Sequence, residues 1–276
     1  MVLNQIAARG AQKISAENFP VALRVLPHHF RDHLQRAYVY ARFVDDVGDE
    51  ATGDRLALLD QVDRDVQALP AGEAKLTPVA GLLPLVREHG LSIQPLRDLI
   101  EANRRDQLIS QYASFDDLLD YCRLSAAPIG RIVLAIADVD DPVAAARSDK
   151  VCAALQVLEH CQDVGEDAAA GRVYLPKSDL QAHGVAEQDL RARTTPAALR
   201  SVIAVQVGKA EQLLGDGIPL VRQLRGWARV AVLGYVAGGR ATAAALRRAD
   251  YDVLARHIAP GKLRTARYAA LVAAGR

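Results

Sequence analysis

The chain has 276 residues, of which 50% are hydrophobic, enough for a sizeable core in one large domain or two small ones. Its 34 basic residues balance 33 acidic ones to a net charge of +1, so we expect no nucleic-acid partner. The three cysteines, Cys122, Cys152 and Cys161, are an odd number at no zinc-like spacing, so we expect free thiols in a reducing cytoplasm. The longest apolar stretch, residues 230–239, is about half the ~20 residues that cross a bilayer, so we expect at most peripheral membrane contact.

The helix start signals in the sequence, and its lack of strand signals, predict an all-α chain. Strand signals are nearly absent, whereas Thr77-Pro78, Asp141-Pro142 and Thr195-Pro196 each place a capping residue before a proline at the first helical position. No flexible linker or repeat is visible, so we expect a single domain over residues 1–276. In chain order the predicted helices cover residues 15–25, 31–49, 54–69, 78–89, 95–111, 115–136, 142–167, 196–224, 227–250 and 262–274, and the longest stretch predicted to be irregular is 168–195.

Two acidic clusters are the most informative feature of the chain. Asp45 and Asp49 form a first aspartate pair, and Asp163 and Asp167 form a second. In a helix, positions i and i+4 lie on one face, and two like charges placed there repel each other. A hard divalent cation offsets that repulsion, and magnesium takes carboxylate oxygens and is commonly completed by substrate phosphates.

The alternative is that these carboxylates form a solvated face or a helix cap, as acidic residues near helix ends usually do. Each pair, however, continues an apolar helical run, residues 37–41 and 151–155, whose face should point into a core. We therefore favour metal and diphosphate binding. Two such helices facing one another would make a magnesium site for a diphosphate.

Two other features of the sequence allow more than one interpretation. Gly234, Gly238 and Gly239 lie inside the helix predicted over 227–250, where they fit either a tight helix crossing or a cavity wall. Residues 28–29 and His33 are histidines at a helical spacing suited to a metal. They follow a proline in an expected surface turn and lack a carboxylate partner, so we interpret them as solvated surface.

Four blocks of the sequence form a distinctive set. They are Tyr38-x-Tyr40-Ala41-Arg42-x-x-Asp45-Asp46-x-x-Asp49-Glu50, Tyr121-Cys122-Arg123-x-Ser125-Ala126-x-Pro128-x-Gly130-Arg131, Leu155-Gln156 leading to Gln162-Asp163-Val164-x-x-Asp167, and Gly171-Arg172-Val173-Tyr174-Leu175-Pro176. Together they resemble the squalene and phytoene synthase family, in the order in which that family carries them and over most of residues 15–180. A further opening block, residues 17–21, together with residues 125–131 and Gln162, is most similar to the hydroxysqualene synthases of bacterial hopanoid biosynthesis.

The resemblance implies an isoprenoid synthase helical bundle with a central cavity and an isoprenoid diphosphate substrate. Two or three Mg²⁺ ions would neutralise the diphosphate leaving group, so that no nucleophilic side chain is needed. The residues implied to hold the metals, and with them catalysis, are Asp45, Asp49, Asp163 and Asp167, with Asp46 in support.

Further residues are implied to contact the substrate. Arg42 would reach the diphosphate, or else form an ion pair with Asp45 or Asp46; Gln156 would orient phosphate or water, or else be an ordinary helix residue. Phe19 belongs to the opening block and is implied to bind substrate. Tyr38, Tyr121 and Tyr174 would stabilise a carbocation by their ring faces or guide it by their hydroxyls, with Tyr121 placed in catalysis; the alternative is that they are core tyrosines.

Glu159 departs from the family pattern, in which Asn stands one turn before the second aspartate pair. Its carboxylate would bind a cation itself, pair with a basic residue or weaken diphosphate binding.

The resemblance implies an enzyme that ionises presqualene diphosphate and lets water capture the cation, giving hydroxysqualene. One alternative is head-to-head condensation of two prenyl diphosphates to a squalene- or phytoene-type product, with or without NADPH. A second is a non-catalytic prenyl-diphosphate binding or assembly protein. Monomer and homodimer are both open.

Overall fold

The computed structural model describes residues 2–7 and 28–274. Within these residues the chain is all-α, as predicted, and the only extended pairing is an isolated bridge between Gln111 and Val173. The chain divides into two compact units, the first made of residues 1–108 and 124–145 and the second of residues 109–123 and 146–276. The single domain over residues 1–276 stays a prediction.

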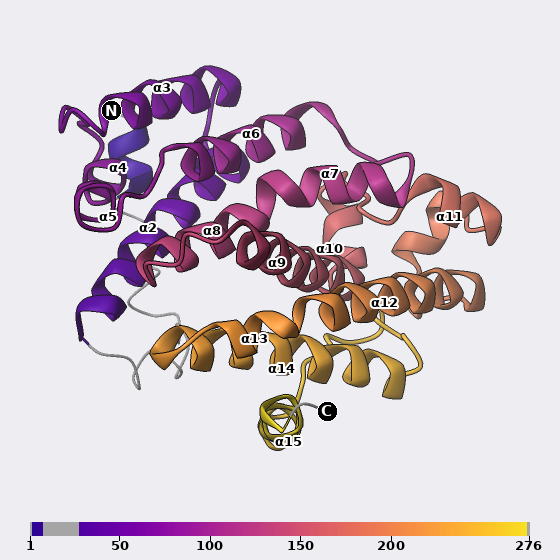
Figure 1. Cartoon of the computed structure of the whole chain (residues 1–276). Helices are drawn as coiled ribbons and strands as arrows, with labels where there is room; N and C mark the ends of the chain where they lie inside the picture. Colours follow the sequence, from indigo (N-terminus) through magenta and orange to yellow (C-terminus); the bar gives the residue numbers. More distant parts are fainter. Residues whose placement is uncertain (1, 8–27, 275–276) are drawn as a thin grey trace. The chain divides into compact units, whose positions relative to one another are not determined.

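In the described part of the first unit, α2 packs against four helices, α3, α4, α6 and α8 (Figure 1). Tyr40 on α2 is fully buried and donates from its hydroxyl to the Leu96 carbonyl at 2.8 Å. Arg97 clamps the Asp63 carboxylate through Nε at 2.7 Å and a second nitrogen at 3.2 Å, which ties α6 to α3. The helices are α2 (His28–Asp49), α3 (Arg55–Ala68), α4 (Thr77–Ala80), α5 (Leu83–His89), α6 (Gln94–Leu108) and α8 (Ala127–Ile136).

The second unit is built around long helices that approach one another closely at glycines. A Cβ on Gly239 of α14 would stand 2.9 Å from both Leu155 and Leu214, and one on Gly217 of α12 would stand 2.5 Å from Val151. A Cβ on Gly234 or Gly238 would meet no described atom within 4 Å, so the tight crossing is confirmed at Gly239 only. The elements are α7 (Phe115–Ser125), α9 (Pro142–Gln162), α10 (Val164–Ala169), α11 (Lys177–Ala182), the 3-10 helix η2 (Glu187–Arg191), α12 (Ala197–Gly217), α13 (Pro219–Gln223), α14 (Gly226–Arg248) and α15 (Lys262–Ala273).

Four predicted helices are each interrupted in the structure. Three of the breaks fall at a proline, Pro84, Pro128 or Pro219, which occupies the start of the next helix because it cannot donate a hydrogen bond further along. The region 168–195, predicted to be irregular, contains the short helices α11 and η2. The helix predicted over residues 15–25 lies outside the described residues.

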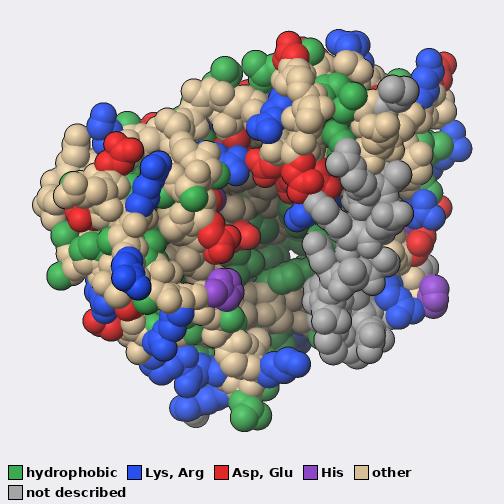
Figure 2. Space-filling model, turned by 180° about the vertical axis from the view of Figure 1, so that it is seen from behind, with side chains coloured by type: hydrophobic (Ala, Val, Ile, Leu, Met, Phe, Trp, Pro, Cys, Tyr) green, Lys and Arg blue, Asp and Glu red, His purple; other side chains and the backbone are tan. Residues whose placement is uncertain are grey.

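The described residues contain no helix that is long and apolar enough to span a bilayer. The face drawn in Figure 2 carries both acidic and basic side chains, in keeping with the balanced composition of the chain.

Candidate active site

The first aspartate pair lies at the C-terminal end of α2, in the first unit. Asp45 and Asp49 are one helical turn apart, and both are exposed. The last turn, residues 46–49, is fully described and contains no Lys, Arg or His. Because a helix C-terminus carries a partial negative charge, each carboxylate here costs about 0.3–1 kcal/mol beyond the repulsion between the two. The end of α2 therefore brings Asp45, Asp46 and Asp49 together with no basic residue in its last turn.

Asn103 of α6 forms a hydrogen bond with the Asp45 carboxylate. Its Nδ2 donates to Asp45 Oδ1 at 3.0 Å and to the Leu99 carbonyl at 3.1 Å. This approach requires Gly48, because a Cβ at that position would stand 2.1 Å from the Asn103 side-chain oxygen. Sequence reasoning missed Asn103. The sequence signal that could have identified it is its position, as a polar residue on the otherwise apolar, buried face of α6.

The surroundings of Asp45 disfavour its charged form. Burial raises the pKa of Asp45 to about 6; the Asn103 hydrogen bond and Arg42 oppose the rise, and Asp49 and Asp106 add to it. The carboxylate still reaches solvent, so water offsets part of the burial effect. A cation beside Asp45 and Asp49 would relieve this cost, since an opposite charge stabilises the carboxylate form.

Arg42 and Asp46 form an ion pair within α2. The Arg42 Nε lies 3.1 Å from Asp46 Oδ1, four residues on, and the Asp46 carboxylate is only 5% exposed. Of the alternatives for Arg42, the structure thus contains the pairing with Asp46. A role for Arg42 at the diphosphate, and for Asp46 at the metals, stays a prediction.

The second aspartate pair lies where α9 passes into α10, in the second unit. The Asp163 amide donates to the Glu159 carbonyl at 3.0 Å and the Asp167 amide to the Asp163 carbonyl at 2.8 Å, so helical bonding continues across the break. The i,i+4 relation that the sequence predicted is therefore kept. Burial raises the pKa of Asp163, and Glu166 and Asp167 raise it further.

His160 connects the second aspartate pair to a group of stacked aromatic rings. Its ring lies on Tyr174 with the centroids 3.8 Å apart and 12° between planes, and Tyr121 stacks on Tyr174 at 5.5 Å. The His160 Nδ1 is 3.8 Å from Asp167 Oδ2, and its Nε2 is 3.3 Å from the Gln156 amide nitrogen. Sequence reasoning assigned no role to His160. The structure shows that it contacts three predicted site residues at once.

Three further residues were predicted for the site. Glu159 is exposed as a residue, yet partial desolvation of its carboxyl raises the pKa of that group; Asp163 and Asp167 add to the rise and His160 opposes it. Tyr38 on α2 is half-buried. Phe19 lies outside the described residues.

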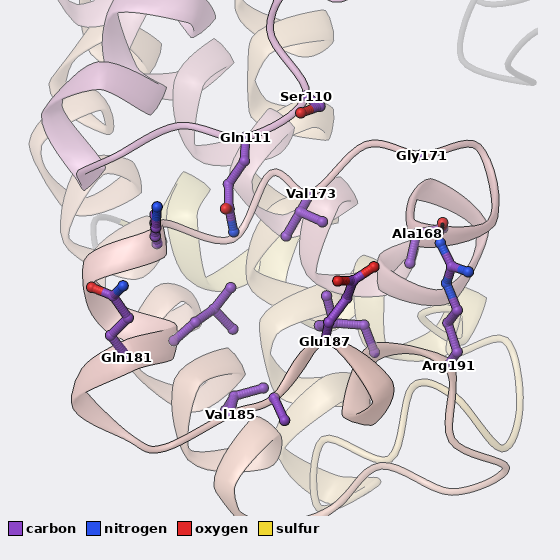
Figure 3. A pocket seen from close by; sticks show the side chains of 13 residues that line it. Ser110, Gln111, Ala168, Gly171, Val173, Gln181, Val185, Glu187 and Arg191 are labelled. Carbon is purple, nitrogen blue, oxygen red and sulfur yellow. Dashed lines mark hydrogen bonds between the residues drawn. The ribbon is translucent and has the colours of Figure 1, made fainter.

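A pocket of about 410 Å³ lies in the second unit, between the loop at Ser110 and Gln111, the end of α10, and η2 (Figure 3). Glu187 and Arg191 extend from η2, and Arg191 donates to the Ala168 carbonyl at 3.1 Å. None of the predicted site residues is among the described residues that line this pocket.

In the described chain, each unit thus offers a pair of aspartates one helical turn apart with neighbouring charges that raise carboxyl pKa values. All the donors are carboxylate oxygens, the ligands that hard divalent cations such as Mg²⁺ prefer. The donor set therefore fits a metal of that class.

Comparison with known sequences agrees with the resemblance described above. The sequence model of the squalene/phytoene synthase family matches residues 13–267. The chain belongs to this family, and it is an enzyme that acts on isoprenoid diphosphates. Enzymes of this type normally use a divalent metal, and the non-catalytic alternative finds no support.

The similar proteins include two hydroxysqualene synthases and one solved squalene synthase structure. The chain is 35% identical over 219 residues to the hydroxysqualene synthase of Zymomonas mobilis, covering 77% of this chain and 72% of that protein. It is 34% identical over 215 residues to the hydroxysqualene synthase of Sinorhizobium fredii, covering 76% and 72%. The crystal structure of squalene synthase HpnC from Alicyclobacillus acidocaldarius superposes with a TM-score of 0.82 at 38% identity, covering 91% of this chain and 96% of that one.

Proposed function

We propose that this protein is a magnesium-dependent enzyme that converts presqualene diphosphate into hydroxysqualene. The observation that carries the proposal is the similarity to two hydroxysqualene synthases at 34–35% identity over most of each chain. Asp45 and Asp49 lie one turn apart in α2, and Asp163 and Asp167 lie one turn apart where α9 passes into α10.

The carboxylates of Asp45, Asp49, Asp163 and Asp167 would hold the magnesium ions, two or three in number, with Asp46 in support. When bound, the metal supplies Lewis-acid neutralisation of the diphosphate leaving group. Asn103 keeps the Asp45 carboxylate in one orientation through its 3.0 Å hydrogen bond. Arg42 adds permanent positive charge, which lets it donate to diphosphate oxygens while it screens Asp46.

The stacked rings of Tyr121, Tyr174 and His160 serve the hydrocarbon part of the substrate. Ring faces attract a cation by about 0.5–2 kcal/mol, and more strongly where water is excluded. Tyr121 and Tyr174 are both buried, at 5% and 8% exposure. Gln156, 3.3 Å from His160, is a suitable group to orient the water that captures the cation.

Head-to-head condensation of two prenyl diphosphates is the second candidate, favoured by membership in a family that includes squalene and phytoene synthases. It differs from the first in substrate and, for squalene, in its need for a hydride donor.

The discriminating experiment gives the purified protein, with magnesium, presqualene diphosphate or farnesyl diphosphate, each with and without NADPH. The reactions are run in ¹⁸O-labelled water, and the extracted lipids are identified by mass spectrometry. We expect hydroxysqualene carrying ¹⁸O from presqualene diphosphate alone. Squalene formed only with NADPH, or a condensed product from farnesyl diphosphate, would support the second candidate instead.

A further inference from the structure

A pair of buried histidines in the first unit lies apart from both aspartate pairs. His33 on α2 and His89 at the end of α5 meet with Nδ1 of His33 2.9 Å from Nε2 of His89, their rings edge to face at 84°. Both side chains are only 9% exposed. The interpretation of His33 as solvated surface is therefore wrong. The side chain of residue 29 lies outside the described residues.

Two carboxylates complete this group. The Glu88 Oε2 lies 3.7 Å from Nε2 of His33, and the Asp138 Oδ1 lies 2.8 Å from Nδ1 of His89. One nitrogen from each histidine and one Glu88 oxygen all lie within 4.8 Å of one another. The carboxylate partner that the sequence did not reveal thus comes from α5 and from the turn after α8.

The hydrogen bond to Asp138 fixes the tautomer of His89. Because a carboxylate only accepts, Nδ1 of His89 must carry the proton and donate it. In this tautomer Nε2 of His89 carries a lone pair that faces Nδ1 of His33 at 2.9 Å. A carboxylate that accepts from the outer nitrogen of a ligating histidine is the usual arrangement around protein-bound zinc, where it orients the ring and raises its basicity.

The protonation state of His33 also suits a ligand. Burial and the neighbouring His89 lower the pKa of His33, against opposing contributions from Glu88 and Asp32. The ring is therefore neutral near pH 7, the form in which imidazole binds metals. A cation would replace the single proton that now lies between the two facing nitrogens.

A pocket gives solvent access to His89. His89 and Asp138 line a pocket of about 570 Å³ in the first unit, together with Asp140 and Asp141. These aspartates give the wall near His89 an excess of negative charge, since Arg131 is the one Lys or Arg among the described lining residues. Glu88 is 62% exposed and so is free to turn toward an arriving ion.

We propose that His33, His89 and Glu88 form a binding site for a divalent transition metal of the zinc class, with Asp138 orienting His89. Two imidazoles and one carboxylate are a common zinc ligand set that leaves a fourth position for water. Zn–N bonds of ~2.0–2.1 Å in a tetrahedral site place the two nitrogens ~3.3 Å apart, so the rings need to separate only slightly from 2.9 Å. The ion would join α2, α5 and the turn after α8, and thereby stabilise the helix that carries Asp45 and Asp49.

The test uses the full-length protein after chelator treatment and dialysis. Zinc chloride alone is titrated by calorimetry, and cobalt chloride is titrated in parallel because tetrahedral Co²⁺ absorbs visible light. We expect wild type to bind one more equivalent than His89→Gln, with a rise in Tm that this variant lacks. Asp138→Asn suits the left-handed backbone of that residue, φ 54°, and should weaken zinc binding about tenfold.

Three controls keep the result decisive. His183→Gln alters an exposed histidine of the second unit and should bind zinc like wild type. The double variant Asp45→Asn, Asp49→Asn should also retain the extra equivalent, which separates this site from the proposed magnesium site. Glu88→Gln changes an exposed side chain, so it should fold even where His89→Gln does not, and it should bind more weakly than wild type. Equal zinc binding by wild type, Glu88→Gln and Asp138→Asn would overturn the proposal.

Discussion

Asn103 donates a hydrogen bond from Nδ2 to Oδ1 of Asp45 across 3.0 Å, linking the middle of α6 to the acidic end of α2. The bond favours the charged form of Asp45 and lowers its pKa against the effect of burial. It is possible only because Gly48 leaves room for the Asn103 side chain.

Asn103→Ala should therefore raise the pKa of Asp45 further and weaken magnesium binding. Partners of this kind typically contribute about 10- to 100-fold to metal affinity or activity. The measurement is the rate as a function of magnesium concentration. Gln67→Ala is a matched control, because Gln67 donates a similar amide hydrogen bond to Asp63 in the same unit at 3.0 Å. If both variants have the same magnesium profile, Asn103 does not support the metal ligands.

Neutralising either aspartate pair should abolish turnover while the protein still folds. Asp45→Asn with Asp49→Asn, and separately Asp163→Asn with Asp167→Asn, remove the proposed metal ligands of one unit each. Without magnesium, Tm should hold or rise, because burial and like charges raise the pKa of Asp45 and Asp163 and so disfavour their charged forms. Near-wild-type activity in either double variant would contradict the site assignment.

Asp45 should make the stability of the metal-free protein pH-dependent. Its pKa is about 6 in the folded protein and ~3.9 in an unfolded chain, so between these values the folded state binds more protons. The stability from Asp45 is thus present below about pH 4 and is lost as pH rises through 6. Asp45→Asn lacks this loss, so its Tm relative to wild type should increase from pH 4 to pH 7 in chelator. A constant difference across that range would mean that Asp45 titrates normally.

Glu159→Asn should shift the magnesium dependence and leave the fold unchanged. Glu159 is exposed and its charge acts on Asp163 and Asp167, so removing it reduces the attraction for cations there. We expect half-maximal rate at a magnesium concentration roughly two- to tenfold higher, in line with a loss of about 0.4–1.4 kcal/mol. Rates measured over a magnesium series test this. Identical curves would show that Glu159 does not act on the metals.

The ring of Tyr174, rather than its hydroxyl, should carry the stacking with His160 and Tyr121. Tyr174→Phe keeps the ring and should lower Tm less than a variant that removes the ring. Tyr174→Leu removes contacts worth about 0.5–1.5 kcal/mol per aromatic pair and should lower Tm by several degrees. Thermal unfolding of the two variants side by side is the measurement. Equal losses in both would assign the effect to the hydroxyl.

Local sequence was sufficient for the helical fold and for both aspartate pairs. The i,i+4 spacing of each pair survives in the structure because helical periodicity is a property of neighbouring residues, and it holds even across the break at Asp163. The prolines at residues 78, 142 and 196, which we predicted to begin helices, do lie at the start of α4, α9 and α12, because the effect of a proline on the backbone is also local. Where a proline lay inside a longer periodic run, as at Pro128, the apolar pattern hid the break.

Only the tertiary structure decided which side chains meet across the chain. Asn103 reaches Asp45 over 58 residues of sequence, and His33 meets His89 over 56. Each of these contacts depends on how two helices pack, on a glycine that permits close approach or on a turn that delivers a carboxylate. Such partners leave no periodic pattern in the sequence, because hydrogen bonds between distant helices are set by packing geometry and not by spacing along one helix.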